Sequence, residues 1–285
     1  IGLDGKLIGH EGCVNTVEFS RCGDRLVRHG LVADDGKVQT NILGKHNGRV
    51  QKLAVEPGSP YIFYSCGEDG LVQHFDLRSN SSSKVFCRAS FTGINHQYSS
   101  SNRLKLNSII IDPRDPNYFS LGGSDEYARV YDIRNLDGPV ETFCPKHLIK
   151  TRDNINITGM SYSSTSELLN MGLGPYPVAA SLEHLDSLDD PQMYLGHTNS
   201  LTAKGVSFFG PCSEYVMSGS DCGHIFIWGK KDGRIVRVIE GDGRVVNQVE
   251  PHPNIPIFAS SGLEQNIKLW APVSDSIRPL PRDLH

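Results

Sequence analysis

The chain alternates short apolar runs with polar turns, and one succession of these recurs along most of its length. An apolar strand precedes a turn with Pro or Gly, a second apolar strand ends in a small-residue turn with an acid, and a third strand follows. β-branched and aromatic runs between turn residues are typical of strands in hairpins, and no long stretch has the 3.6-residue period of a helix. The six segments that follow this pattern begin at Val14, Val50, Leu106, Ile155, Ala203 and Val245.

Units of this kind predict an all-β fold. A small sheet of about 40 residues cannot bury both of its faces alone, but units stacked around a ring cover each other and leave only short edges. We therefore predict a β-propeller with about six recognisable repeat units over residues 1–273. Two segments between units, 79–102 and 171–191, are predicted loops, and 274–285 is a predicted C-terminal tail.

Two of the repeats end alike. Residues 63–78 read FYSCGEDGLVQHFDLR, and residues 119–134 read FSLGGSDEYARVYDIR. Each carries a Gly, an Asp two residues later, an apolar-rich strand, and then an aromatic, an Asp, an aliphatic residue and an Arg. The acid–arginine ends are Asp76 with Arg78 and Asp132 with Arg134.

Further residues resemble the signature of the WD-repeat family, whose members typically have seven blades. They are Gly9-His10, Gly196-His197, Ser218-Gly219-Ser220, Trp228 and Trp270. The resemblance implies that a His, a Ser or Thr, an Asp in the tight turn and the Trp form a buried hydrogen-bonded network within a blade. The best candidates for this structural network are His197, Ser218 and Trp228, with the turn acids Asp69 and Asp125.

The match to that signature is incomplete. Cys222 and Glu264 stand in place of the turn Asp in the last two repeats, and Phe75 and Tyr131 replace the Trp in the two repeats above. The pattern also breaks after Leu26-Val27 and after Leu168-Leu169, where no clear third strand follows. We infer a shortened propeller that lacks internal segments at both places, with exposed edges if the ring does not close. Divergent but complete blades are the alternative.

The two acid–arginine ends resemble the WD-repeat substrate receptors of cullin-4 E3 ubiquitin ligases. In those receptors a box ending in aromatic–Asp–x–Arg docks on an adaptor, the large damaged-DNA-binding protein. The resemblance implies that Asp76, Arg78, Asp132 and Arg134 bind this adaptor and that the chain recruits an unknown protein substrate without catalysis of its own. The alternative for each Arg is an ion pair with a carboxylate of the neighbouring blade. The runs SGSDCGHIFIW, VNQVEPHPNIP, GEDGLVQHFDLR and FCPKHLI resemble the same receptors.

Composition narrows the function further. The 285 residues carry a net charge of −4, which disfavours a strongly basic nucleic-acid binder. No apolar run approaches the ~20 residues of a membrane helix, and the first residues lack the features of a signal peptide. Seven Cys without a CxxC spacing argue against a disulfide framework or structural zinc. We expect an intracellular protein of the nucleus, the cytoplasm or both.

Candidate chemistry beyond protein binding is weak. The chain has no nucleophile elbow, P-loop or His-Glu-x-x-His pattern, so we expect no catalytic residue, metal or cofactor. A general WD-repeat scaffold without a ligase link remains an alternative, as does a chromatin-binding module. The latter would use a local basic group, Lys230, Lys231, Arg234 and Arg237, although a solvated outer strand explains the same residues.

Overall fold

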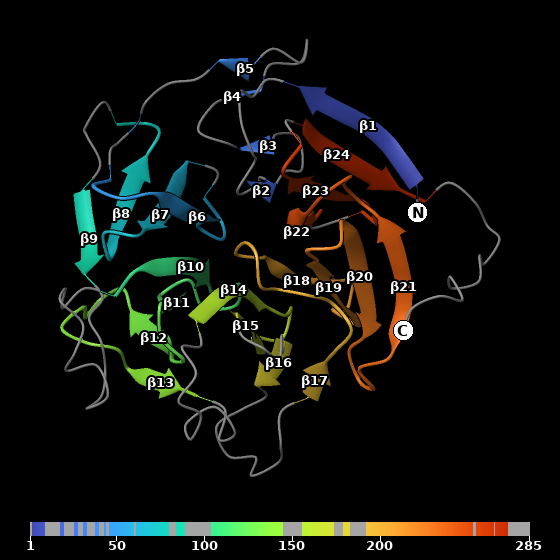
Figure 1. Cartoon of the computed structure of the whole chain (residues 1–285). Coiled ribbons are helices and arrows are strands. Elements are labelled where there is room, and N and C mark those ends of the chain that lie inside the picture. Colours follow the sequence, from blue (N-terminus) through green and yellow to red (C-terminus); the bar gives the residue numbers. More distant parts are fainter. Residues whose placement is uncertain are drawn as a thin grey trace.

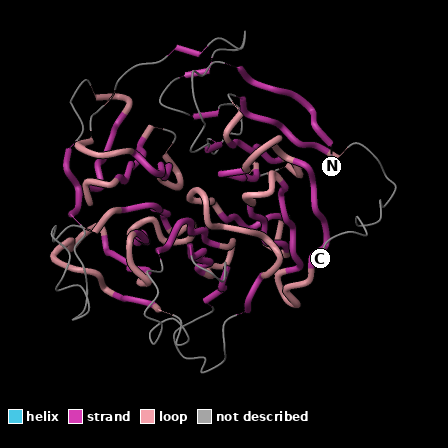
Figure 2. Tube along the Cα trace, in the orientation of Figure 1, coloured by secondary structure: helices cyan, strands magenta, loops and turns pink. Residues whose placement is uncertain are grey.

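The computed structural model is an arrangement of strands around a central axis (Figure 1). It describes residues 2–8, 18–19, 26–27, 31–32, 38–39, 43, 46–59, 61–79, 84–88, 104–144, 156–173, 179–182, 192–252, 255–264 and 266–272. These residues form strands, turns and bends and no helix (Figure 2), so none of them belongs to a helix long and apolar enough to cross a membrane.

Five sheets have four strands each, and four of these are antiparallel meanders in chain order. One contains β6 (Val50–Val55), β7 (Ile62–Gly67), β8 (Leu71–Asp76) and β9 (Lys84–Arg88). The next contains β10 (Leu106–Ile111), β11 (Tyr118–Gly123), β12 (Ala128–Asp132) and β13 (Glu141–Phe143). The third contains β14 (Asn156–Tyr162), β15 (Leu168–Leu173), β16 (Ala179–Leu182) and β17 (Gln192–Tyr194). The fourth contains β18 (Val206–Phe209), β19 (Tyr215–Gly219), β20 (His224–Gly229) and β21 (Ile235–Glu240).

The ring closes by joining the two ends of the chain. β22 (Val246–Pro251), β23 (Phe258–Gly262) and β24 (Asn266–Ala271) form a sheet whose outer strand is β1 (Gly2–Ile8), antiparallel to β24. Two short ribbons fill the remaining sector: β2 (Glu18–Phe19) with β3 (Leu26–Val27), and β4 (Leu31–Val32) with β5 (Val38–Gln39). β2 lies beside both β6 and β22, so six blades surround the axis (Figure 1).

This architecture confirms the predicted all-β propeller and corrects part of its expected organisation. The break predicted after Leu169 is wrong, because Asn170 continues β15 and β16 supplies the third strand. The predicted loops 79–102 and 171–191 are wrong in part, since they contain β9, the end of β15 and β16. These strands were missed because strand pairing overrides weak local signals. The break after Val27 corresponds to the two short ribbons, and the tail 274–285 lies outside the described residues.

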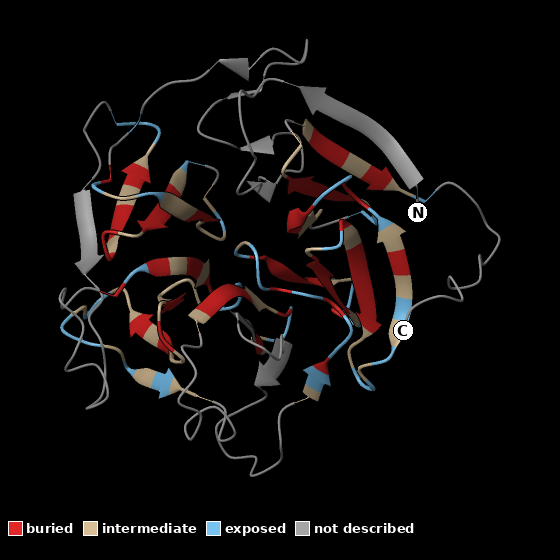
Figure 3. Ribbon diagram, viewed as in Figure 1, coloured by how far each residue is buried: buried red, intermediate tan, exposed pale blue. Residues whose placement is uncertain are grey.

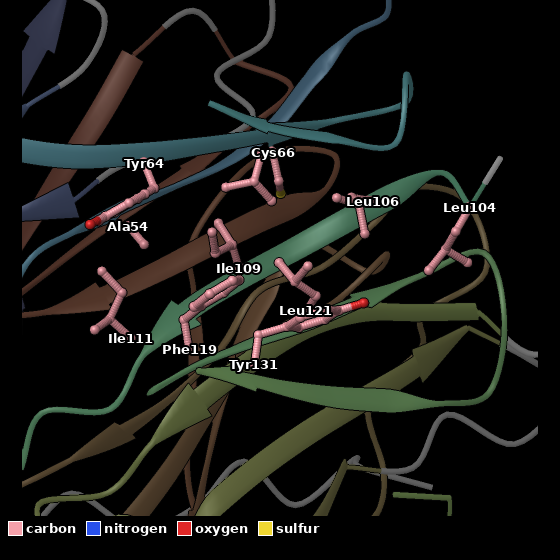
Figure 4. Close-up of a cluster of buried hydrophobic side chains, with 11 residues drawn as sticks. Ala54, Tyr64, Cys66, Leu104, Leu106, Ile109, Ile111, Phe119, Leu121 and Tyr131 are labelled. Carbon is pink, nitrogen blue, oxygen red and sulfur yellow. The ribbon is translucent and has the colours of Figure 1, made fainter. Parts of the chain in front are cut away.

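Apolar packing between neighbouring blades forms the core. Figure 4 shows one such layer, in which side chains of the β6–β9 blade meet those of the β10–β13 blade. Cys66, Leu106, Ile109 and Leu121 are completely buried there. Burial decreases from the inner strands outward (Figure 3), and the outer strand β21 has Val238 as its one buried position. Each blade therefore depends on its neighbours to cover its faces.

A β-bulge occurs at the start of the inner strand in four blades. The register between the first and second strands shifts at Gln51, Asn107, Thr158 and Asn247. A bulge inserts one extra residue and re-aims its side chain out of the regular alternation. Three of these side chains then form polar links between blades. Asn107 donates to the Ile157 carbonyl (2.9 Å), Thr158 accepts from Asn199 (3.0 Å), and Asn247 accepts from Thr202 (2.6 Å).

The Gly shared by the two similar repeats is required by close backbone packing. A Cβ on Gly67 would lie 2.7 Å from the Arg49 carbonyl oxygen, and a Cβ on Gly123 would overlap the Lys105 carbonyl oxygen. Both contacts lie where the second strand ends beside the start of the first. The repeat therefore keeps Gly here because backbone on the adjacent strand leaves no room for a side chain.

We predict that Gly123→Ala lowers the free energy of unfolding by about 1–3 kcal/mol, because the added methyl group must displace backbone. Urea unfolding followed by circular dichroism measures the change. Gly138→Ala is the matched control, since nothing lies within 4 Å of a Cβ at that position. Equal stability of the two variants would contradict the packing argument.

Candidate functional site

The first acid–arginine end forms a compact clasp on an exposed turn after β8. The Arg78 guanidinium donates from Nε to Asp76 Oδ1 and from Nη2 to Asp76 Oδ2, both at 2.9 Å. The Arg78 backbone N–H also donates to Asp76 Oδ1 at 3.0 Å. The guanidinium carbon lies 5.6 Å from the ring centre of Tyr61, within the range of a cation–π contact.

The second end repeats this geometry after β12. Arg134 donates from Nε to Asp132 Oδ1 at 2.8 Å and from Nη2 to Asp132 Oδ2 at 2.6 Å. Its guanidinium carbon lies 5.8 Å from the ring centre of Tyr118. The two clasps therefore share an acid, a guanidinium and an aromatic ring in the same arrangement. We name them the Asp76 clasp and the Asp132 clasp.

Both clasps are charged and accessible. The Arg78 and Arg134 side chains are 57% and 59% exposed. Hydrogen bonds from the arginine lower the pKa of Asp76 and of Asp132 to about 2, so each pair stays ionised at any physiological pH. The expected alternative, an ion pair with the neighbouring blade, is not what these arginines form, because each binds the carboxylate two residues before it.

The sequence analysis did not predict the tyrosines of the two clasps. Tyr61 and Tyr118 each stand at or just before the start of the second strand, and each is followed by the strand that ends in the shared Gly. A Tyr at the corresponding place in both repeats was the available signal. The sequence does not show that this Tyr lies beside the Arg, because their contact depends on how the strands pair. The start of the second strand lies beside the end of the third, where the Leu77 N–H donates to the Tyr61 carbonyl at 2.9 Å.

The two clasps lie on one face of the propeller. Successive strands of a blade are antiparallel, so the β6–β7 and β8–β9 connections lie at one end of the blade and the β7–β8 turn at the other. The β10–β13 blade has the same order. Since both clasps follow the third strand of adjacent blades, they occupy neighbouring positions on the same rim (Figure 1).

The turn acid Asp69 holds a buried histidine in the β6–β9 blade. His46 Nδ1 bonds Asp69 Oδ1 at 3.0 Å, and His46 Nε2 bonds Ser65 Oγ at 2.6 Å. Asp69 Oδ2 also accepts from the Asn47 backbone N–H at 2.8 Å. The blade thus forms the Asp–His–Ser part of the network, with Phe75 stacked on Phe63 at 4.7 Å where the family signature has Trp.

The turn acid Asp125 has a different partner, which corrects the expected network. Arg129 binds it through Nη1 at 2.9 Å and through Nη2, and both side chains are completely buried. Leu121 occupies the position of Ser65, so this blade offers no hydroxyl to a histidine. A buried two-point ion pair replaces the histidine network, because a carboxylate in this position needs a hydrogen-bonded cation once it leaves water.

The predicted network of His197, Ser218 and Trp228 does not form. Trp228 Nε1 donates to the Leu195 carbonyl at 2.8 Å, and Ser218 Oγ donates to the Gly219 carbonyl at 2.8 Å. Both ring nitrogens of His197 are buried and have no hydrogen bond among the described residues, while its ring packs edge-on against Trp228 at 5.2 Å. The cause is Cys222, which supplies no carboxylate where Asp69 holds His46. Burial lowers the pKa of His197 to about 4.

Two further groups weighed from sequence do not gather into a site. Within the basic group, Lys230 forms an ion pair with Glu167, and Arg234 lies 3.8 Å from Asp232. In the described part of the chain, no three His, Cys, Asp or Glu residues lie close enough together to hold a metal ion.

Comparison with known proteins agrees with the architecture. Residues 190–229, which run from just before β17 to the end of β20, match the family described as WD domain, G-beta repeat. The fold is a WD-repeat β-propeller. The matched segment contains His197 and Trp228, so the chain retains the WD signature even where the hydrogen bonds behind it are absent.

Curated relatives share part of this propeller. The chain is 45% identical over 101 residues to human DDB1- and CUL4-associated factor 6, covering 33% of this chain and 12% of that protein. It is 42% identical over 91 residues to mouse WD and tetratricopeptide repeats protein 1, covering 32% and 13%. It is 46% identical over 77 residues to WD repeat protein iqw1 of Schizosaccharomyces pombe, covering 27% and 10%. The matched part thus spans about an eighth or less of these relatives.

We predict that His197 makes the protein less stable in mild acid. The pKa of an unfolded histidine is near 6.5, whereas that of folded His197 is about 4, so the unfolded chain binds more protons between these two pH values. Its contribution to stability is therefore full above pH 6.5 and falls as the pH approaches 4. At pH 5.5 we expect a loss of about 1 kcal/mol. Urea unfolding across pH should show a shallower decline for His197→Phe, and identical pH profiles would contradict the assignment.

A second prediction concerns a substitution that restores the turn acid missing from this blade. Cys222→Asp places a carboxylate where Asp69 stands in the β6–β9 blade, so the pKa of His197 should rise and the protein should gain about 1 kcal/mol at neutral pH from the new hydrogen bond. Nuclear magnetic resonance titration of the imidazole measures the pKa. Cys212→Asp, an exposed Cys away from this histidine, is the control. An unchanged pKa in Cys222→Asp would show that the turn does not face His197.

Proposed function

We propose that the chain is a non-catalytic substrate receptor of a cullin-4 RING E3 ubiquitin ligase and that the two clasps dock it on the damaged-DNA-binding-protein adaptor. The observation that carries the proposal is the pair of matched, exposed acid–arginine clasps on one rim. Arg78 and Arg134 make the contact, and Asp76 and Asp132 orient them. The ubiquitin chemistry belongs to other subunits of such a ligase.

The clasps are well suited to hold a partner protein. A guanidinium has five N–H donors, and the carboxylate of its own clasp takes Nε and one N–H of Nη2. Arg134 Nη2 also donates to the Tyr118 hydroxyl at 3.4 Å, whereas Nη1 of each arginine makes no hydrogen bond with the described residues and can donate to carbonyls or carboxylates of a partner. Because the acid and the tyrosine already fix the guanidinium plane, less side-chain entropy is lost on binding. Arg is also enriched among residues that dominate interface affinity.

The names of the relatives support the proposed receptor function. Two of them carry DDB1- and CUL4-associated factor 6 as their name, in human and in mouse. More specific runs, including VNQVEPHPNIP and FCPKHLI, resemble cullin-4-associated factor eight. We propose that the chain belongs among such receptors. An intracellular protein of the nucleus or the cytoplasm would fit this role.

A general scaffold is the alternative from the same class, and a chromatin binder is the alternative from another. Because Lys230 and Arg234 of the basic group each lie beside a carboxylate, the chromatin alternative has little support. Neither alternative requires two matched clasps.

The test is capture of the adaptor. Purified adaptor should bind the immobilised chain, and Arg78→Ala with Arg134→Ala should reduce the affinity at least tenfold for each arginine, as for interface hot spots. Arg78→Lys should also weaken binding, because a lysine cannot form the two-point contact with Asp76. Biolayer interferometry measures the affinities, and thermal unfolding checks that the fold is intact.

Arg234→Ala is the matched control, since Arg234 is an exposed arginine on a third-to-fourth-strand connection of another blade. Full adaptor binding by the folded double variant would remove the docking role of the clasps. Absence of binding by the unaltered chain would leave the scaffold as the better description.

A further inference from the structure

A polar pocket opens on the axis of the propeller, on the face opposite the two clasps. Its volume is about 310 Å³, and its walls are the starts of the inner strands β6, β10, β14 and β22 with the segment before β18. The clasps follow the ends of third strands, which run parallel to the inner strands. The pocket and the clasps therefore lie at opposite ends of the blades.

The four bulges build this pocket. Gln51, Asn107, Thr158 and Asn247 are the residues at which the strand registers shift, and all four line the cavity. A regular strand would alternate its side chains between the two faces of its blade, whereas a bulge turns the extra residue out of that alternation. Four blades thus place a polar side chain at the same level of the axis, because the same bulge occurs in each of their inner strands.

The charges at the pocket are of one sign. Arg49, Lys52 and Lys204 line it, and none of its described lining residues is Asp or Glu. Lys204 is completely buried and is held by Asp221 and by Thr202. Lys52 forms an ion pair with Glu250 at 3.7 Å, and burial raises the pKa of that carboxyl group.

Arg49 is the cation available to a ligand. It is exposed at the rim, and its guanidinium forms no ion pair or hydrogen bond with the described residues. The Glu68 backbone N–H donates to the Arg49 carbonyl at 2.9 Å, and the Glu68 carboxylate accepts a hydrogen bond from Gln51 at 3.1 Å. Asn247 adds a second donor. Its amide oxygen accepts a hydrogen bond from Thr202, and its amide nitrogen makes no hydrogen bond with the described residues.

The segment that forms the rim is fixed before any ligand arrives. Asp221 Oδ2 accepts the backbone N–H of Ser200 at 2.6 Å and of Leu201 at 3.0 Å, and its other oxygen binds Lys204. Leu201 itself is 71% exposed beside the pocket, so an apolar contact stands next to the cationic rim. A partner would therefore meet a rigid surface, which lowers the entropic cost of binding.

We propose that this pocket binds an acidic segment of a partner protein, with one anionic side chain inserted toward Arg49 and Asn247 and an apolar neighbour against Leu201. The volume suits one side chain rather than a folded element. As the surface that selects what is recruited, the pocket rests on the proposed receptor function, although its chemistry can be tested without the adaptor. A carboxylate and a phosphate offer the same anionic oxygens to these donors.

The test uses short fluorescein-labelled peptides and fluorescence anisotropy. An oligoglutamate peptide containing leucine should bind at least about tenfold more tightly than the matching oligoglutamine peptide, the factor expected from one charge-assisted contact. Arg49→Glu should abolish this preference. Arg244→Glu, an exposed arginine on the same face outside the pocket, should keep it. A phosphoserine peptide that binds more tightly than the glutamate peptide would assign the site to a phosphorylated partner.

Three outcomes would overturn the proposal. They are equal binding of the glutamate and glutamine peptides, equal losses in Arg49→Glu and Arg244→Glu, and tighter Arg49-dependent binding of a single-stranded oligonucleotide. The two functions separate cleanly, because Arg49→Glu should retain adaptor capture and the Arg78, Arg134 double variant should retain peptide binding. Loss of adaptor capture with intact peptide selectivity would contradict only the docking role.

Discussion

Coverage of each blade by its neighbours is the constraint on which this structure depends. A small sheet with apolar side chains on both faces cannot be stable in water by itself, and here those faces are covered by the adjacent blades. The ring must therefore close, and it does so by pairing β1 with β24, which joins the two ends of the chain in one sheet. Polar side chains at the bulges add links between inner strands, so the axis is held by hydrogen bonds as well as by packing.

Two Asp–Arg ion pairs in the β10–β13 blade have different roles. Asp125 and Arg129 form a completely buried ion pair that replaces the histidine network, whereas Asp132 and Arg134 form an exposed clasp a few residues later. The roles differ because the first pair is shielded from solvent and the second is exposed to it. The buried pair satisfies charges that could not otherwise leave water, and its donors are used up inside the blade. The exposed pair fixes the plane of the Arg134 guanidinium, and in the proposed function its Nη1 donors bind the partner.

The two faces of the ring are thus specialised by the alternation of strand direction. Third strands end at the face with the clasps, and inner strands begin at the face with the polar pocket. The receptor function that we propose needs two such surfaces, one for the ligase and one for the recruited protein. The WD-repeat propeller provides them because each blade contributes turns to both ends, and function is placed in those turns with little effect on the core.

The amino-acid sequence by itself determined the strand-and-turn pattern, the propeller and the two acid–arginine ends, because strand period, turn residues and repeated spacing are local properties. It also located Cys222 and Glu264 where the family signature has Asp. It could not show that His197 and Trp228 take separate partners, that Asp125 binds Arg129, or that β16 completes a blade. Those outcomes depend on residues distant in the chain. Only the tertiary structure decided them, as it decided the pocket, because hydrogen bonds and bulges are fixed by what lies across the strand rather than by the order of residues along it.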